Sequence, residues 1–150
     1  AWSPVGDLIV FNGPDRGGQN PGLQAMTIDE SGNDRYLVTG TANGNDSRPT
    51  WSPDGRYVVF MSKDRGGESS WEIYRLTWGT GEIIRLTDRN IKQDGLPTIS
   101  PDGKWVAFMS DRDGFWRLYY VSIDGGPVHF LSDISGQPLS WLEHTIQWVE

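Results

Sequence analysis

The feature that most constrains the fold is an internal repeat. Its best-preserved part is a Trp-Ser-Pro-Asp-Gly motif, followed by an apolar segment that ends in phenylalanine. The three copies begin at Trp2, Trp51 and Ile99, which are 49 and 48 residues apart, and in the first copy Val5 replaces the aspartate of the motif. A repeat of this length predicts copies of one supersecondary unit stacked side by side.

Each repeat contains the pattern of four short β-strands. The first strand (49–51 and 97–99) stops at Ser-Pro-Asp-Gly, where proline and glycine favour a tight turn. The second (57–61 and 105–109) is almost continuously apolar, as expected when both faces of a sheet are covered. The third is expected at 71–77 and 116–123, and the fourth at 83–87 and 128–132. No window has convincing helical periodicity, so the chain is predicted to be all-β, with the four-stranded antiparallel blades of a β-propeller.

The second and third repeats resemble the repeat of the TolB-like β-propellers. The resemblance rests on Trp-Ser-Pro-Asp-Gly-Arg at 51–56, Met-Ser-Asp-Arg-Asp-Gly at 109–114, Asp-Gly-Gly at 124–126 and the closing Leu-Thr or Leu-Ser. It implies the propeller fold and slightly favours an extracytoplasmic location, although the compartment stays open. Related repeats occur in a periplasmic translocation protein, in the gating propellers of prolyl-oligopeptidase-like peptidases and in tricorn-type proteases. The resemblance therefore identifies architecture more strongly than function.

The repeats divide the chain into four segments. Residues 1–49 form a first blade with an incomplete inner strand, 50–97 a second, 98–137 a third, and 138–150 a terminal strand pair. This amounts to about three and a half blades, whereas a closed propeller usually needs at least about four. Open ends would leave apolar faces and strand edges uncovered. We therefore expect self-association, most simply a homodimer closing a six-bladed ring, with Leu139, Trp141, Ile146 and Trp148 in its ring-closing strands.

The loops between the second and third strands carry repeated Asp-Arg pairs, which alternation of the strands would gather on one face of the disc. Asp46, Asp88, Asp94 and Asp133 are expected on the same face. Such a polar ring could bind a partner protein or peptide, a cation or a sugar. Alternatively, each aspartate caps its own turn and each arginine lies across the neighbouring blade. The candidate ligand face consists of Asp15, Arg16, Asp64, Arg65, Asp111, Arg112 and Asp113.

The eight tryptophans offer a second candidate for ligand binding. Trp2, Trp51 and Trp141 share a motif position that Ile99 fills in the third copy, which favours a core role between blades. Trp71, Trp78 and Trp116 lie near strand ends and could instead stack on a ligand.

Composition argues against most catalytic functions. The chain has no cysteine, no Gly-x-Ser-x-Gly motif, and only His129 and His144 as imidazole groups. A formal charge of −7 opposes binding to nucleic acid, and no apolar run is long enough for a membrane helix. We expect a non-enzymatic binding or scaffold module without cofactor or metal. A fragment of the gating propeller of a prolyl-oligopeptidase-like serine peptidase and an excised or engineered propeller segment are the alternatives.

Overall fold

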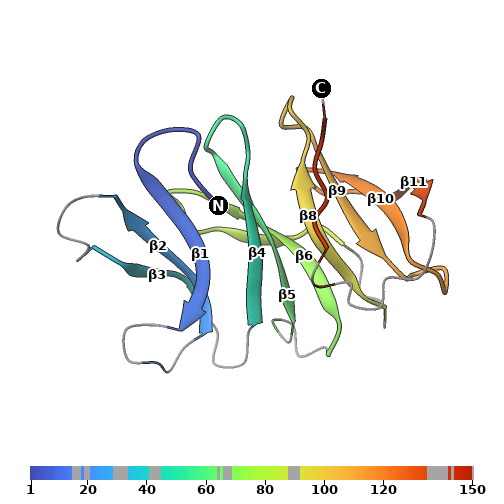
Figure 1. The fold of residues 1–150 in the computed structure, drawn as a ribbon, viewed down its shortest axis with the longest axis horizontal. Coiled ribbons are helices and arrows are strands. Elements are labelled where there is room, and N and C mark those ends of the chain that lie inside the picture. Colours follow the sequence, from blue (N-terminus) through green and yellow to red (C-terminus); the bar gives the residue numbers. More distant parts are fainter. Residues whose placement is uncertain are drawn as a thin grey trace.

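The computed structural model describes residues 1–14, 18, 21–28, 34–40, 45–63, 65, 69–87, 92–134, 142 and 144–149. These residues form eleven β-strands in three antiparallel sheets and contain no α-helix. The sheets stand side by side in the order of the sequence repeats (Figure 1). This arrangement confirms the predicted all-β fold built from propeller blades.

Within each blade, strands that follow one another in the sequence are hydrogen-bonded neighbours. Blade 1 contains β1 (Leu8–Pro14), β2 (Pro21–Thr27) and β3 (Tyr36–Gly40). Blade 2 contains β4 (Asn45–Trp51), β5 (Tyr57–Lys63), β6 (Trp71–Thr77) and β7 (Ile83–Arg85). Blade 3 contains β8 (Asp94–Ile99), β9 (Trp105–Ser110), β10 (Arg117–Ser122) and β11 (His129–Asp133).

Blade 1 has only a short counterpart of the innermost strands β4 and β8. Trp2 forms an isolated antiparallel bridge with Ile9. Ala1 and Val10 exchange hydrogen bonds, the Val10 amide donating to the Ala1 carbonyl at 2.8 Å and the Ala1 ammonium group to the Val10 carbonyl at 2.6 Å. Residues 1–3 thus pair with the edge of β1, and the division of the chain into blades at the expected boundaries stays a prediction.

The innermost strands begin earlier than the sequence predicts. We expected them at 49–51 and 97–99, but β4 and β8 start four and three residues before those points. Each contains a bulge, because pairing is interrupted between Ser47 and Thr50 and between Gly95 and Thr98. Proline has no amide hydrogen to donate to the strand ladder, so in the sequence an X-Pro pair resembles the start of a strand. In this structure the pair lies inside the strand, at the bulge.

The turns after β4 and β8 have the conformation that their motif predicts. Gly55 and Gly103 adopt positive φ angles of 72° and 74°, which confirms the role assigned to these glycines. In the turn of blade 3, the Ser100 hydroxyl donates to Asp102 at 2.6 Å and accepts the Trp105 amide at 3.0 Å. The serine and the aspartate therefore hold the two strands at a fixed distance.

The apolar core lies between the blades rather than inside one sheet. Along β5, Val58 and Phe60 face blade 1, whereas Val59 and Met61 face blade 3. This alternation explains why the second strand of each repeat is continuously apolar. The junction of blades 1 and 2 buries Val10, Leu23, Ala25, Trp51, Val58, Phe60, Tyr74 and Leu76. The junction of blades 2 and 3 buries Val59, Met61, Ile73, Leu86, Ile99, Val106, Phe108, Tyr119, Val121 and Ile123.

Candidate functional site

The predicted ligand face is only partly described by the structure. Asp15, Arg16, Asp64, Asp88, Leu139 and Trp141 lie outside the described residues. The remaining members, Arg65, Asp111, Arg112 and Asp113, follow the second strands of blades 2 and 3. Their side chains can therefore be compared between two consecutive copies of the repeat.

Two of the aspartates expected on this face are buried. The side chains of Asp46 and Asp94 are fully inaccessible and form ion pairs with Arg65 and Arg112, which are themselves only 13% and 15% exposed. Arg112 donates to both carboxylate oxygens of Asp94, at 3.2 and 3.1 Å. A buried carboxylate is costly unless it is paired. These arginines are consequently held within the fold.

The position of the arginines corrects one expectation. The guanidinium carbon of Arg112 lies 5.5 Å from the ring centre of Phe108 and 5.0 Å from that of Tyr119, both in its own blade. Arg65 covers Phe60 and Tyr74 of blade 2 in the same way. The arginine thus lies over the aromatic pair of its own blade and not across the neighbouring blade, because that pair offers a cation–π contact beside the buried aspartate.

The other two acidic residues of the blade 3 loop are also engaged locally. Asp111 accepts a hydrogen bond from the Gln93 amide at 2.7 Å. Asp113 accepts the Tyr119 hydroxyl, and burial together with this hydrogen bond raises the pKa of Tyr119 to about 12. Asp133 pairs with Arg117 at 2.7 Å. All three aspartates thus have partners within blade 3 or the segment before it, but none of these contacts is the capping of the aspartate's own turn that was expected.

A threonine links blade 1 to blade 2, and it was not anticipated from the sequence. The Thr39 hydroxyl accepts the Leu23 amide of its own blade at 3.0 Å and donates to Asp46 of the next blade at 2.5 Å. The signal that could have revealed it is a threonine seven residues before an aspartate, which recurs at Thr87 and Asp94.

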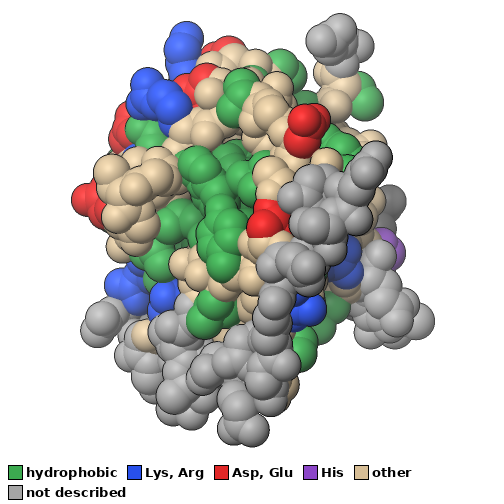
Figure 2. Space-filling view, turned by 90° about the vertical axis from the view of Figure 1, so that its left-hand side faces the viewer, with side chains coloured by type: hydrophobic (Ala, Val, Ile, Leu, Met, Phe, Trp, Pro, Cys, Tyr) green, Lys and Arg blue, Asp and Glu red, His purple; other side chains and the backbone are tan. Residues whose placement is uncertain are grey.

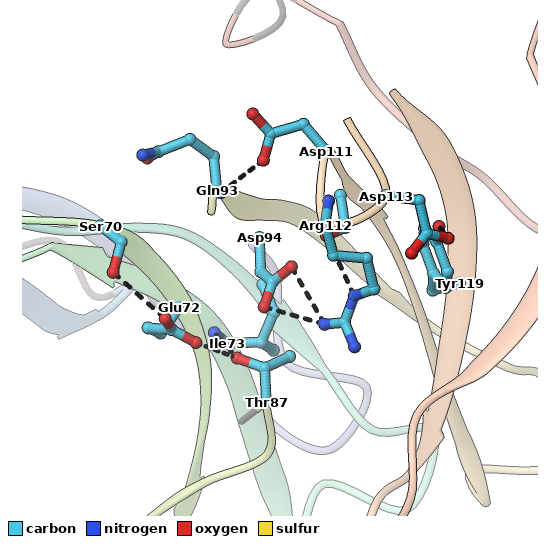
Figure 3. A network of polar contacts seen from close by, with 11 residues as sticks. Ser70, Glu72, Ile73, Thr87, Gln93, Asp94, Asp111, Arg112, Asp113 and Tyr119 are labelled. Carbon is cyan, nitrogen blue, oxygen red and sulfur yellow. Dashed lines mark hydrogen bonds and ion pairs between the residues drawn. The ribbon is translucent and has the colours of Figure 1, made fainter. Parts of the chain in front are cut away.

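The junction of blades 2 and 3 has a larger polar network (Figure 3). Thr87 accepts the Ile73 amide at 3.1 Å, but it donates at 2.6 Å to Glu72, which also accepts the Ser70 hydroxyl at 3.2 Å. The Glu72 side chain is almost completely buried. Burial raises the pKa of Glu72 to about 7, and the nearby Asp94 adds to the rise. Burial likewise raises the pKa of Asp94, while the Arg112 charge opposes that effect.

At its opposite end, the same junction has a contact between the two blades. Arg75 of blade 2 donates to the Ile123 carbonyl at 3.1 Å and to Asp124 at 3.0 Å, both in blade 3. Its guanidinium carbon lies 4.4 Å from the ring centre of Tyr57. Arg75 thus joins the two blades at this end of the junction.

The tryptophans divide according to their blade. Trp51 and Ile99 are buried, as expected for a core position, and Trp51 packs against Trp78 with ring centres 4.7 Å apart. Trp71 and Trp78 pack partly buried against the two core clusters, and Trp116 is partly buried. Trp2 differs from Trp51, which has the same motif position, since 61% of Trp2 is exposed.

The exposure of Trp2 belongs to an apolar face that no blade covers. Figure 2 shows the blade 1 end of the molecule, where hydrophobic side chains gather at the centre of the face. Trp2 occupies the repeat position of Trp51, and Ile28, which is 45% exposed, occupies that of Trp78. At the other end of the arc, Leu131 is 43% exposed although its counterpart Leu86 is 3% exposed. Each end therefore exposes residues of the kind that the internal junctions bury.

The described part of the C-terminal segment lies beside the innermost strands. A groove of about 280 Å³ is lined by residues 48–50 and 96–98 together with 144–147. Arg48 donates to the Leu142 carbonyl. Residues 144–149, including Ile146 and Trp148, form no strand in the single chain. Their ring-closing role stays a prediction.

Two further properties concern the described residues alone. They contain no group of three or more His, Cys, Asp or Glu side chains arranged to hold a metal ion. They also contain no helix that is long and apolar enough to span a membrane.

Comparison with known proteins places these blades in a family. The family model of the TolB beta propeller domain matches residues 34–138, whereas no curated protein sequence matches the chain. A putative TolB from Agrobacterium tumefaciens shares 31% sequence identity at a TM-score of 0.71, covering 89% of this chain and 48% of that one. TolB from Acinetobacter baumannii shares 27% identity at a TM-score of 0.68, covering 91% and 32%.

The same blades also resemble part of an enzyme. A puromycin-hydrolyzing peptidase from Mycobacterium tuberculosis shares 16% identity at a TM-score of 0.66, covering 91% of this chain and 22% of that one, a likeness of fold. The chain thus spans less than half the length of each of these three solved structures. The repeat motif, the three blades and the family match over residues 34–138 lead to one conclusion: the chain belongs to the TolB-type β-propeller family.

Proposed function

We propose that this chain is a non-enzymatic propeller scaffold that completes its ring by binding a second copy of itself. The observation that carries the proposal is the contrast between equivalent positions. Trp51 is 8% exposed and Leu86 3%, whereas their counterparts at the two ends, Trp2 and Leu131, are 61% and 43% exposed. Burying one such side chain contributes about 1.5–3 kcal/mol, so these faces favour association.

The internal junctions indicate how the two faces would meet. In each of them, one blade presents its motif residue and the apolar residues of its second strand to the far face of the blade before it. Blade 1 presents Trp2, Ile9 and Phe11 at these positions, and the far face of blade 3 includes Trp105 and Leu131. Blade 1 of one copy would therefore pack on blade 3 of the other.

A pair of three-bladed arcs closes by symmetry. Each copy contributes one blade 1 face and one blade 3 face, so a two-fold axis generates two identical junctions and leaves neither face free. The result would be six blades, within the usual range for propellers. Further blades of a longer polypeptide could cover the same faces, and the mass of the purified chain separates these cases.

Local engagement of polar groups supports the non-enzymatic part of the proposal. The Ser52 and Ser100 hydroxyls each donate to the aspartate of their own turn, at 2.7 and 2.6 Å. His129 stacks on Tyr120, with ring centres 5.1 Å apart. These contacts give the serines and this histidine structural partners. The likeness to the peptidase concerns the fold alone, whereas the TolB-type match includes the sequence repeat.

Light scattering of the purified 150-residue chain tests the assembly. We expect a particle of twice the 16.8 kDa chain mass. Trp2→Glu and Leu131→Glu should each yield a monomer or a strongly weakened dimer, because each places a charge in both junctions. Tyr36→Glu is the matched control, since Tyr36 is exposed beside the closed junction of blades 1 and 2.

Mixing the two charged variants provides a sharper test. A heterodimer of Trp2→Glu with Leu131→Glu has both charges in one junction and an intact second junction. The mixture should therefore recover part of the dimer that neither variant forms alone. A compact monomer for the unmodified chain, or equal dimerisation of all variants, would contradict the proposal.

A further inference from the structure

The two closed junctions differ at one position that controls a hydrogen bond between blades. In both, a threonine hydroxyl accepts a backbone amide, from Leu23 in blade 1 and from Ile73 in blade 2. The residue before that amide is Gly22 in blade 1 and Glu72 in blade 2. Only the second junction therefore has a carboxyl group next to its threonine at this position.

A threonine hydroxyl has one hydrogen to donate, and the two junctions use it differently. Thr39 gives its hydrogen to Asp46 of the following blade. Thr87 gives its hydrogen to Glu72 of its own blade, although Asp94 of blade 3 also lies within its hydrogen-bonding reach. An ionised carboxylate can only accept, so Thr87 cannot donate to Asp94 while it donates to Glu72.

The charges around Glu72 come from both blades. Asp94, which pairs with Arg112, lies near it in blade 3, and Arg85 lies on the neighbouring strand β7. Ser70 donates to the other carboxylate oxygen. Arg112 is already committed to Asp94 at 3.1 Å. Glu72 thus has hydroxyl groups as its hydrogen-bond partners, which suit a neutral carboxyl group as well as an ionised one.

We propose that Glu72 is a proton-controlled link between blades 2 and 3. When neutral, its carboxyl group donates to the Thr87 oxygen, which has a second lone pair beside the one that accepts the Ile73 amide. The Thr87 hydrogen is then free to bond Asp94, as Thr39 bonds Asp46. When Glu72 is ionised, this link between blades is lost and two carboxylates, Glu72 and Asp94, face each other across the junction.

The expected consequence is a junction that weakens as the pH rises. The pKa of about 7 in the folded chain exceeds the ordinary glutamate value of about 4.3. The unfolded chain therefore releases the Glu72 proton at a lower pH than the folded chain does. The contribution of this group to the free energy of unfolding is present at acidic pH and is lost as the pH rises through about 7. Between pH 5.5 and 8, this linkage raises the unfolding equilibrium constant by roughly 30-fold.

Carbon-13 NMR of the side-chain carboxyl groups in the full chain measures the titration directly. The Glu72 signal should titrate with a midpoint near 7, and the Asp94 signal should report the same step. In Thr87→Val the relay is cut, so Asp94 should lose that response. A Glu72 midpoint near the ordinary value of about 4.3 would overturn the proposal without any variant.

Urea unfolding from pH 5.5 to 8 tests the effect on stability. Glu72→Gln keeps a neutral donor at this position, so its unfolding constant should lack the roughly 30-fold rise of the parent chain. Thr39→Val is the matched control, because the first junction has no such carboxyl and the rise should persist. The two histidines are present in every variant, so their titration cancels in the comparison. The same pH slope in Glu72→Gln and the parent chain would refute the link.

Discussion

The turn glycines provide the sharpest test of the blade geometry. In Gly103→Ala, the added Cβ would lie 3.6 Å from the Pro53 side chain, an ordinary contact. The penalty is therefore the left-handed backbone, about 1–2 kcal/mol for a residue with a side chain. Restriction of the unfolded chain offsets roughly 0.4–1 kcal/mol of it. We expect a net loss of about 1 kcal/mol, and a larger one for Gly103→Val.

The equivalent change in blade 2 adds a steric term. At Gly55 the backbone is the same, but a Cβ would clash with a methyl group of Val5 in the neighbouring turn. Val5 must then leave its rotamer or shift, at about 0.5–1.5 kcal/mol. Gly55→Ala should therefore lose about 2 kcal/mol. Val5→Ala should relieve the excess, because it removes the clashing methyl groups.

Urea unfolding at one fixed chain concentration measures these differences, and a double-mutant cycle isolates the coupling of Gly55 to Val5. Gly13→Ala is the control, since Gly13 lies in β1 without a positive φ. Equal midpoints for Gly55→Ala and Gly103→Ala would refute the steric argument. An unchanged midpoint for Gly103→Ala would refute the assigned turn conformation.

Three further predictions concern the buried ion pair, the C-terminal segment and chemical reactivity. Asp94→Asn should lower the free energy of unfolding by about 3 kcal/mol, since it leaves Arg112 without its buried partner. Asp102→Asn at an exposed turn should lower it much less, and urea unfolding compares the two variants. Removal of residues 138–150 should convert the dimer to aggregates or unfolded chain, and light scattering that shows the same compact particle would contradict this role. Serine-directed probes and chelators should change neither the mass of the chain nor its melting temperature, and labelling of a single serine would count against a scaffold.

Sequence reasoning succeeded where the structure depends on short-range rules. The Ser-Pro-Asp-Gly turns were predictable because each turn is closed by its own residues, such as Ser52 and Asp54. The strand after each turn was predictable because a continuous apolar run is required when both of its faces are covered. The third strand at 71–77 was predicted with its observed bounds, since glycine-rich segments precede and follow it.

The contacts between blades could not be predicted in the same way. Whether Arg112 lies on its own blade or on the next depends on where Asp94 and Phe108 meet, and no local pattern encodes that. The exposure of Trp2 depends on the missing neighbour of blade 1, although its motif position is the same as that of Trp51. The contact of Glu72 with Thr87 likewise depends on which residues of β6 and the segment after β7 meet, and no local pattern encodes that.

The seven-residue spacing between threonine and aspartate limits the length of the segments that connect one blade to the next. Thr39 and Thr87 each stand seven residues before the aspartate that begins the polar contacts of the following blade. An insertion or deletion in the segments from Thr39 to Asp46 or from Thr87 to Asp94 would change the distance between a threonine and an aspartate whose positions are set by two different sheets. As such chains diverge, we therefore expect the segments that connect one blade to the next to conserve their length.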